Sequence, residues 1–244
     1  MQYQMVEWPY PIKCREREEV TTDVLVLGGE IAGCWAALAA CRMVVNVVIV
    51  EKAHVSSSGP AGCDHWVYAT TNLFSKVSPE ELLGAEEYNW NGYLNGITFY
   101  ITAKDSWDIL LEYEKYGAKI RDTDNEFEGA AFRDPESKFL YDYDNKHMLR
   151  VWGQTFKPAL YKALLAAGVK VFNRISATSL LTSKKDGVVS VTGSTGVNTR
   201  TGKFYVFKAK AVVLATNASS GRLWFYTGHK IGLTKNMPRL GLEL

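Results

Sequence analysis

The stretch LVLGGEIAG, from Leu25 to Gly33, decides the fold of this 244-residue chain. Aliphatic residues predict a buried parallel strand over 23–27, the two glycines that follow predict a tight turn, and small residues predict a helix over 32–43. The segment VNVVIVEK then supplies a second strand that closes with Glu51. Together they make a βαβ unit of about 30 residues, so we expect an α/β fold with a doubly wound, Rossmann-like sheet.

The same stretch carries most parts of a dinucleotide site. Such a site needs a tight turn, backbone close to a diphosphate, a helix N-terminus aimed at it and an acid for the ribose hydroxyls. Gly28 meets the first need, Gly33 permits close packing of helix on strand, and Glu51 lies 23 residues after Gly28. The pattern favours a dinucleotide fold over a doubly wound sheet with an ordinary strand-end glutamate. It leaves open whether a dinucleotide is bound, because Glu30 stands where bare backbone is expected.

The composition is that of an ordinary globular protein. Hydrophobic residues make up 47% and charged residues 22% of the chain, and the formal net charge is +2. Because lysine and arginine form no dense run, we expect no nucleic-acid partner. No stretch approaches the roughly 20 apolar residues that span a bilayer, and the first residues hold no apolar signal core. We therefore expect a cytoplasmic protein without direct membrane insertion.

Helices dominate the segment after the βαβ unit. Residues 54–72 are small and polar and predict a loop. Two helices are expected over 78–90 and 102–120, the first with Ser78 as its N-cap and the second with Gly117 at its end. Apolar residues that share one face of the second helix are Trp107, Leu110 and Leu111.

The rest of the chain predicts mainly strands. Residues 121–150 are acidic and aromatic, and we expect strands and turns over the substrate side. A glycine-capped helix over 155–168 leads into a strand over 169–175. A three-stranded β-meander within 177–218 then feeds back to a buried strand, AVVLAT, at 211–216.

Three segments resemble a known family. They are DVLVLGGEIAGCWAALAA at 23–40, VEKAHVSSSGPAG at 50–62 and KAKAVVLATNA at 208–218. They resemble the FAD-binding domain of the fumarate reductase and succinate dehydrogenase flavoprotein family, particularly the branch with adenylylsulfate reductase alpha subunits, over about residues 20–220. The resemblance implies an FAD-dependent oxidoreductase whose flavin carries the hydride or electron pair.

The resemblance also implies where FAD is held. The loop from Ser57 to Gly62 would wrap the flavin diphosphate and one edge of the isoalloxazine ring, and the strand near Ala177 would offer backbone to the adenine. The turn after the last strand would lie against the cofactor. With the first turn and the acid of the second strand, the predicted FAD-binding residues are Gly28, Gly29, Glu30, Ala32, Gly33, Glu51, Lys52, Ser58, Gly59, Ala61, Gly62, Ala177, Ala215, Thr216 and Asn217.

Two of these positions depart from the family pattern. Glu30 replaces the second fingerprint glycine, and Asn217 replaces the glycine of an Ala-Thr-Gly turn. At Glu30 a Cβ and a carboxylate stand where a doubly charged diphosphate would touch backbone, and at about 4 Å the repulsion costs about 1 kcal/mol in water and more at a lower dielectric. The side chain could turn into solvent or carry a proton. Asn217 is a milder change because asparagine tolerates positive φ better than most residues.

The expected organisation is an arm over 1–20, an FAD-binding domain over 21–220 and a tail over 221–244 that is truncated relative to the family. In the family a capping domain and a second flavin-binding segment follow. We expect either the N-terminal part of a longer redox protein or a reduced subunit that needs a partner, which the resemblance implies to be an iron–sulfur electron-transfer subunit. The small-molecule substrate is not identified. The alternative is a cofactor-free subunit with a structural or assembly role, whose site Glu30 and Asn217 have eroded.

A few other residues could carry chemistry. His65, just past the flavin loop, is the one catalytic candidate: it could donate to a flavin carbonyl or a substrate oxyanion, or be a partly buried histidine held by a backbone carbonyl. We expect His54, His147 and His229 at the surface. The acidic segment Asp122–Glu128 lacks coordinating spacing and predicts a solvated turn. No hydrolytic pairing of nucleophile and base can be argued from spacing.

We expect no metal site, because the cysteines form no CxxC pair. The cysteines are expected to be small buried hydrophobic residues: Cys14, Cys34, Cys41 and Cys63. Core packing, rather than cofactor contact, is the expectation for the aromatic residues Trp152, Phe156, Tyr161, Trp224, Phe225 and Tyr226.

Overall fold

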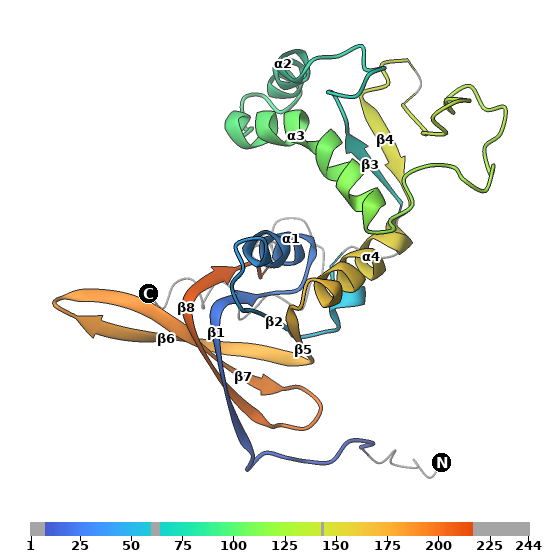
Figure 1. The fold of residues 1–244 in the computed structure, drawn as a ribbon. Helices are drawn as coiled ribbons and strands as arrows, with labels where there is room; N and C mark the ends of the chain where they lie inside the picture. Colours follow the sequence, from blue (N-terminus) through green and yellow to red (C-terminus); the bar gives the residue numbers. More distant parts are fainter. Residues whose placement is uncertain (1–7, 60–63, 143, 217–244) are drawn as a thin grey trace, which may run out of the picture. The chain divides into compact units, whose positions relative to one another are not determined.

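The computed structural model describes residues 8–59, 64–142 and 144–216, which fall into two compact units (Figure 1). The described parts of 1–59 and 161–244 form the first unit, and those of 60–160 form the second. Helix α4 (Gly153–Ala166) begins in the second unit and ends in the first.

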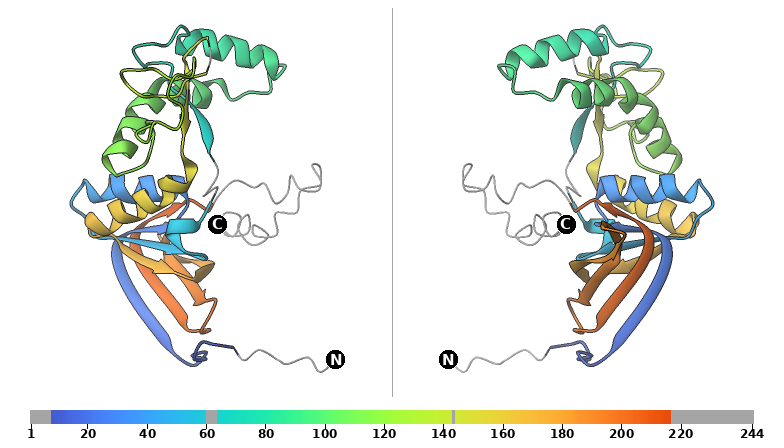
Figure 2. Two further views of the ribbon diagram at one scale, coloured as in Figure 1. Left: turned by 90° about the vertical axis from the view of Figure 1, so that its right-hand side faces the viewer. Right: turned by 90° about the vertical axis from the view of Figure 1, so that its left-hand side faces the viewer.

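The first unit is built on one six-stranded sheet with the order β5-β2-β1-β8-β7-β6. Strands β5, β2, β1 and β8 are parallel, and β7 and β6 extend the sheet in antiparallel fashion. Figure 2 shows the curvature of the long strands from two further sides. The elements are β1 (Arg17–Leu27), α1 (Ile31–Cys41), β2 (Val47–Glu51), the 3-10 turn η1 (Val55–Ser57), β5 (Lys170–Asn173), β6 (Ile175–Lys185), β7 (Val188–Asn198) and β8 (Phe204–Leu214).

The parallel strands bury a different layer on each face. Helix α1 packs against β1 and β2. A hydrophobic cluster joins alternate residues of β1 and β2 to the antiparallel strands, and its buried members are Leu25, Leu27, Val48, Val50, Ile175, Tyr205 and Phe207. The alternation follows from the two-residue period of a strand, which sends successive side chains to opposite faces. The predicted α/β, doubly wound fold with a meander is confirmed.

Two strand boundaries differ from the sequence-based expectation. Strand β1 begins at Arg17 instead of 23, and its polar first half pairs with β8 from Phe204 onward. Charged pairs hold these halves together: Lys203 Nζ lies 2.7 Å from Glu18, and Lys208 pairs with Glu19. Such cross-strand pairs replace the apolar alternation that the sequence signal depends on. The third meander strand and the buried strand AVVLAT are likewise one continuous strand, β8.

The second unit combines two helices with a two-stranded sheet. Helix α2 (Pro79–Asn89) has the predicted Ser78 cap, which forms a full capping box with Glu81. Helix α3 (Gly96–Lys115) begins earlier than predicted because Asn95 caps it through an Oδ1 that accepts the Thr98 N–H at 3.1 Å. Strands β3 (His65–Tyr68) and β4 (Met148–Val151) pair antiparallel. The sequence missed β3, since four residues show no clear period.

The segment between α3 and β4 is built from turns around a buried acid, which corrects the expected solvated patch. Asp122 is fully buried, and its carboxylate pairs with Arg133 Nε at 2.7 Å. Burial alone would raise the pKa of Asp122, but the N–H groups of Phe127 and Glu126 and the Arg133 guanidinium outweigh it and lower that pKa. The other acids of the segment, Asp124, Glu126 and Glu128, are exposed as expected.

Candidate functional site

The carboxyl ends of the parallel strands meet at one edge of the first unit. The Gly28 N–H donates to the Val50 carbonyl at 2.8 Å, and the Ala215 N–H donates to the Leu27 carbonyl at 2.8 Å. The turn after β1 is thereby held between the ends of β2 and β8. In doubly wound sheets this edge is where ligands bind.

Two glycines make the turn possible. Gly28 has φ +103°, and a Cβ placed on it would lie 2.2 Å from the Ala215 carbonyl oxygen. A Cβ on Gly33 would lie 1.9 Å from the Gly28 carbonyl oxygen. Both neighbours are backbone and cannot rotate away, so only glycine allows β1, the turn and α1 to pack this closely.

The peptide groups of Gly29 join the turn to two other segments. Its N–H donates to Glu51 Oε2 at 2.6 Å, and its carbonyl accepts the Ser58 hydroxyl at 2.7 Å. The other Glu51 oxygen accepts the Ala53 N–H at 2.7 Å. Glu51 is 3% exposed, and each of its carboxylate oxygens keeps a second lone pair. The predicted acid and the predicted loop are thus fixed to one peptide of the turn.

Glu30 is the N-cap of α1 but does not cap it with its side chain. Its backbone is extended, with φ −75° and ψ −172°, and the residue is half-buried. The Cβ, Cγ and Cδ of Glu30 lie 3.3–3.4 Å from the position that a Cβ on Gly59 would take, so its side chain runs alongside Gly59. The first N–H groups of a helix have no partner within the helix and carry partial positive charge. A carboxylate therefore stands beside an anion-attracting helix end.

The structure brings most of the predicted cofactor residues together. Contacts or hydrogen bonds connect the turn to Gly33, Glu51, Ser58, Ala215 and Thr216, and connect Glu30 to Gly59. Ala32 is exposed in the first turn of α1, and Lys52 is half-buried after β2. Ala177 lies on β6, partly buried against the hydrophobic cluster. Ala61, Gly62 and Asn217 lie outside the described residues.

Sequence reasoning missed two residues that hold this edge. Asn173, at the end of β5, accepts the Val55 N–H through Oδ1 at 2.8 Å. Cys34 lies beneath the turn, with its Sγ 3.3 Å from the Gly29 carbonyl oxygen. The position of Asn173 at the end of a parallel strand was the available signal, since such ends meet at one edge.

The histidines differ from the expected surface positions. His54 is half-buried; its Nδ1 accepts the Ser56 N–H at 3.3 Å at the start of η1, and its ring packs edge-on against Tyr161. His147 is also half-buried, with Nδ1 3.1 Å from Asp142 Oδ2. Both corrections have one cause: a neighbouring aromatic or polar group gives the imidazole a partner, which spacing does not reveal. His65 lies on β3, and its catalytic role stays a prediction. His229 lies outside the described residues.

The expected packing roles hold for some residues and fail for one. Trp152 and Phe156 are buried, and Phe156 stacks on Tyr113 with ring centroids 4.4 Å apart. Cys34 is buried, whereas Cys14 is exposed, which corrects the expectation of buried cysteines. Positions that lie outside the described residues are Cys63, Trp224, Phe225 and Tyr226.

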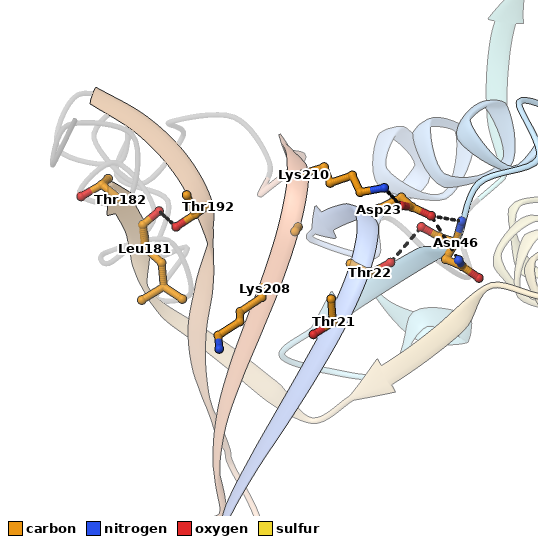
Figure 3. Close-up of a pocket in the computed structure, with 10 residues that line it drawn as sticks. Thr21, Thr22, Asp23, Asn46, Leu181, Thr182, Thr192, Lys208 and Lys210 are labelled. Carbon is orange, nitrogen blue, oxygen red and sulfur yellow. Dashed lines mark hydrogen bonds and ion pairs between the residues drawn. The ribbon is translucent and has the colours of Figure 1, made fainter. Parts of the chain in front are cut away.

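A groove of about 780 Å³ lies toward the amino-terminal ends of the same parallel strands (Figure 3). Lys210 Nζ lies 2.7 Å from Asp23 Oδ1, and the other Asp23 oxygen accepts the Asn46 N–H at 2.9 Å. Hydroxyl groups of Thr21, Thr182 and Thr192 also line it. The charges of the groove are paired with each other, which leaves the carboxyl edge as the candidate site.

Two features are absent from the described ranges. No helix there combines the length and the apolar character needed to cross a bilayer. No group of three or more His, Cys, Asp or Glu side chains is arranged to hold a metal ion in this part of the chain.

Comparisons with known proteins agree with the geometry. The profile of the FAD binding domain family matches residues 23–233. The flavoprotein-like relative named fumarate reductase (CoM/CoB), from Methanothermobacter marburgensis, is 26% identical over 230 residues, which are 93% of this chain and 39% of that protein.

Solved structures give the same picture. Adenylylsulfate reductase from Archaeoglobus fulgidus matches with a TM-score of 0.72 and 26% identity, over 97% of this chain and 38% of that chain. The Sdh1 complex of Mycobacterium smegmatis shares the fold, with a TM-score of 0.68 and 23% identity over 89% of this chain and 39% of that chain. This chain therefore spans about two fifths of the length of these relatives.

Proposed function

The chain belongs to the FAD binding domain family, and from that membership we propose that it binds FAD at the carboxyl edge of its parallel strands. In this proposal it is the flavin-binding portion of an oxidoreductase of the fumarate reductase and adenylylsulfate reductase type. When bound, FAD would supply a ring that accepts and donates a hydride or an electron pair.

One observation carries the proposal: the Gly29 peptide is bonded to both Glu51 and Ser58. This peptide holds the acid of the second strand and the loop after it against the turn at the α1 N-terminus. A dinucleotide requires these three parts together. The fit is supported by the cradle around Gly28 and Gly33, where a Cβ would strike backbone.

Each part has a separate task in the proposed site. The turn and the first N–H groups of α1 would face the diphosphate, because a helix N-terminus favours anions. The free lone pairs of Glu51 would accept ribose hydroxyls. Ser58 would hold the loop that continues through Gly59, and the predicted contacts of Ala61, Gly62, Ala177 and Asn217 complete the proposal. His65 is the proposed catalytic candidate.

The rest of the assembly is inferred from the resemblance to the family. We place the protein in the cytoplasm, where its partner would be an iron–sulfur electron-transfer subunit and its substrate a small molecule. The segments that complete the flavin and substrate sites would come from further chain or from that partner. In this proposal, residues 21–220 are the FAD-binding domain, preceded by an arm over 1–20 and followed by a tail over 221–244.

The test is an FAD titration of the purified chain, followed by visible absorbance after removal of free ligand. We expect flavin absorbance that stays with the protein and quenching of flavin fluorescence on binding. FMN, which lacks the adenylate half, is the matched control ligand and should bind at least about tenfold more weakly. A folded but colourless protein after incubation with excess FAD would overturn the proposal in favour of the cofactor-free structural subunit.

A further inference from the structure

The carboxylate of Glu30 lies between the two segments that the proposed function assigns to the FAD diphosphate. It caps the helix whose N–H groups would face the phosphates, and its side chain runs along Gly59. Because Cβ, Cγ and Cδ all lie close to Gly59, the contact involves the length of the side chain and not just its tip. Any diphosphate held here therefore meets this group.

Within the described residues, no salt bridge neutralises Glu30. The first turn of α1 holds neither acidic nor basic residues. The titratable groups in the segments around it are Glu51, Lys52 and His54. Glu51 accepts two backbone N–H groups and adds a second carboxylate beyond Gly29. His54 is occupied with Ser56 at the start of η1.

A charged Glu30 and a bound diphosphate oppose each other, but a protonated Glu30 does not. A neutral carboxylic acid has one O–H donor, so protonation turns a repelling group into a hydrogen-bond donor to a phosphate oxygen. An apolar or anionic environment can hold a carboxylic acid neutral at ordinary pH for this purpose. The contact with Gly59 limits the alternative, in which the side chain turns away.

We propose that Glu30 binds the FAD diphosphate as a neutral carboxylic acid that donates its O–H, so that FAD binding takes up a proton. The inference rests on the proposed function. Glu30 is then a binding residue in its own right, and the acid at the glycine position is a changed contact with the cofactor. The helix N-terminus supplies the remaining donors.

The test is calorimetry of FAD binding at about pH 6 in two buffers with different ionisation enthalpies, which counts the protons taken up. We expect uptake of roughly half a proton or more by the wild-type chain. We also expect its affinity to fall at least about fivefold between about pH 5.5 and about pH 7.5. Glu128→Gln, which alters an exposed acid of the second unit, is the matched control and should leave both results unchanged.

Two substitutions separate charge from bulk. Glu30→Gln keeps the bulk and the donor without the charge, so it should bind FAD with no proton uptake and with no dependence on pH beyond the control. Glu30→Gly removes bulk and charge, and at about pH 7.5 it should raise FAD affinity by at least about tenfold. Thermal unfolding of both variants checks that they are folded.

The outcomes distinguish the two proposals. FAD binding by the wild-type chain without proton uptake, or equal uptake by Glu30→Gln, would overturn the role of Glu30 and leave the FAD site standing. Failure of the wild-type chain and of both folded variants to bind FAD at any pH would overturn the proposed function itself, and the role of Glu30 with it.

Discussion

The two ends of the same parallel strands differ in how tightly they are specified. At the carboxyl edge, a methyl group on Gly28 or Gly33 would lie about 2 Å from backbone oxygen. At the amino-terminal end, a groove of about 780 Å³ is lined by threonines and by lysines paired with acids (Figure 3). Close backbone constraint, rather than open volume, therefore marks the candidate site, because a diphosphate is bound by fixed N–H groups.

The largest effect should come from filling the cradle. Gly33→Ala places a Cβ 1.9 Å from the Gly28 carbonyl oxygen, and the backbone must move to accept it. We expect a loss of about 3 kcal/mol or more in the free energy of unfolding, together with loss of FAD binding. Urea unfolding and the FAD titration measure the two effects.

A second helical glycine provides the control. Gly84 in α2 has no described atom within 4 Å of an added Cβ. Gly84→Ala should therefore stabilise the chain by about 0.5–1 kcal/mol, through helix propensity, and leave FAD affinity unchanged. Equal behaviour of the two variants would show that the carboxyl edge is not the constrained end of the strands.

The next effect should come from the acid of the second strand. Glu51→Gln keeps one acceptor oxygen but turns an amide N–H₂ toward the N–H of Gly29 or Ala53. We expect a loss of about 2 kcal/mol in the free energy of unfolding, because each lost bond to a buried charged group contributes about that much. FAD affinity should fall by about tenfold or more if the carboxylate also holds the ribose. Unchanged affinity would limit Glu51 to a structural role.

Much of the constrained edge could be predicted from the sequence. Gly28, Gly33 and Glu51 carry local signals, since a tight turn, close helix packing and a strand-end acid each demand a residue type at a fixed spacing. The loop around Ser58 followed from a resemblance to the family and not from spacing. The sequence also predicted the α2 cap, because a capping box is a short-range pattern.

Long-range partners could not be predicted. Asn173 meets Val55 across 118 positions, and Asp122 is buried only because turns and Arg133 close over it. The same holds for the first half of β1, whose strand character depends on β8 and on charged pairs across the two strands. These features arise from tertiary contacts that override local preference.

Ser58→Ala should have a smaller effect. It removes the hydroxyl that donates to the Gly29 carbonyl at 2.7 Å and leaves this buried carbonyl with the weak donor Cys34. We expect a loss of about 1 kcal/mol in the free energy of unfolding and a decrease of a few-fold in FAD affinity. Ser57→Ala is the neighbouring control: its exposed hydroxyl donates to His54 at 3.3 Å, and its loss should cost less than about 0.5 kcal/mol.

The smallest effect is expected at the opposite end of the strands, in the groove. Hydrogen bonds from Lys210, and then from the Asn46 backbone and side chain, lower the pKa of Asp23 from 3.8 to about 2. A lowered pKa in the folded state means that Asp23 stabilises the fold above about pH 4 and that this contribution is lost as the pH falls toward about 2. Asp23→Asn should therefore flatten the acid limb of a pH series of thermal unfolding midpoints. FAD affinity should stay at the wild-type value, because the groove does not share the constraint that defines the carboxyl edge. A decrease in affinity comparable to that of Glu51→Gln would show that the two ends of the strands are coupled, and the contrast between them would no longer locate the site.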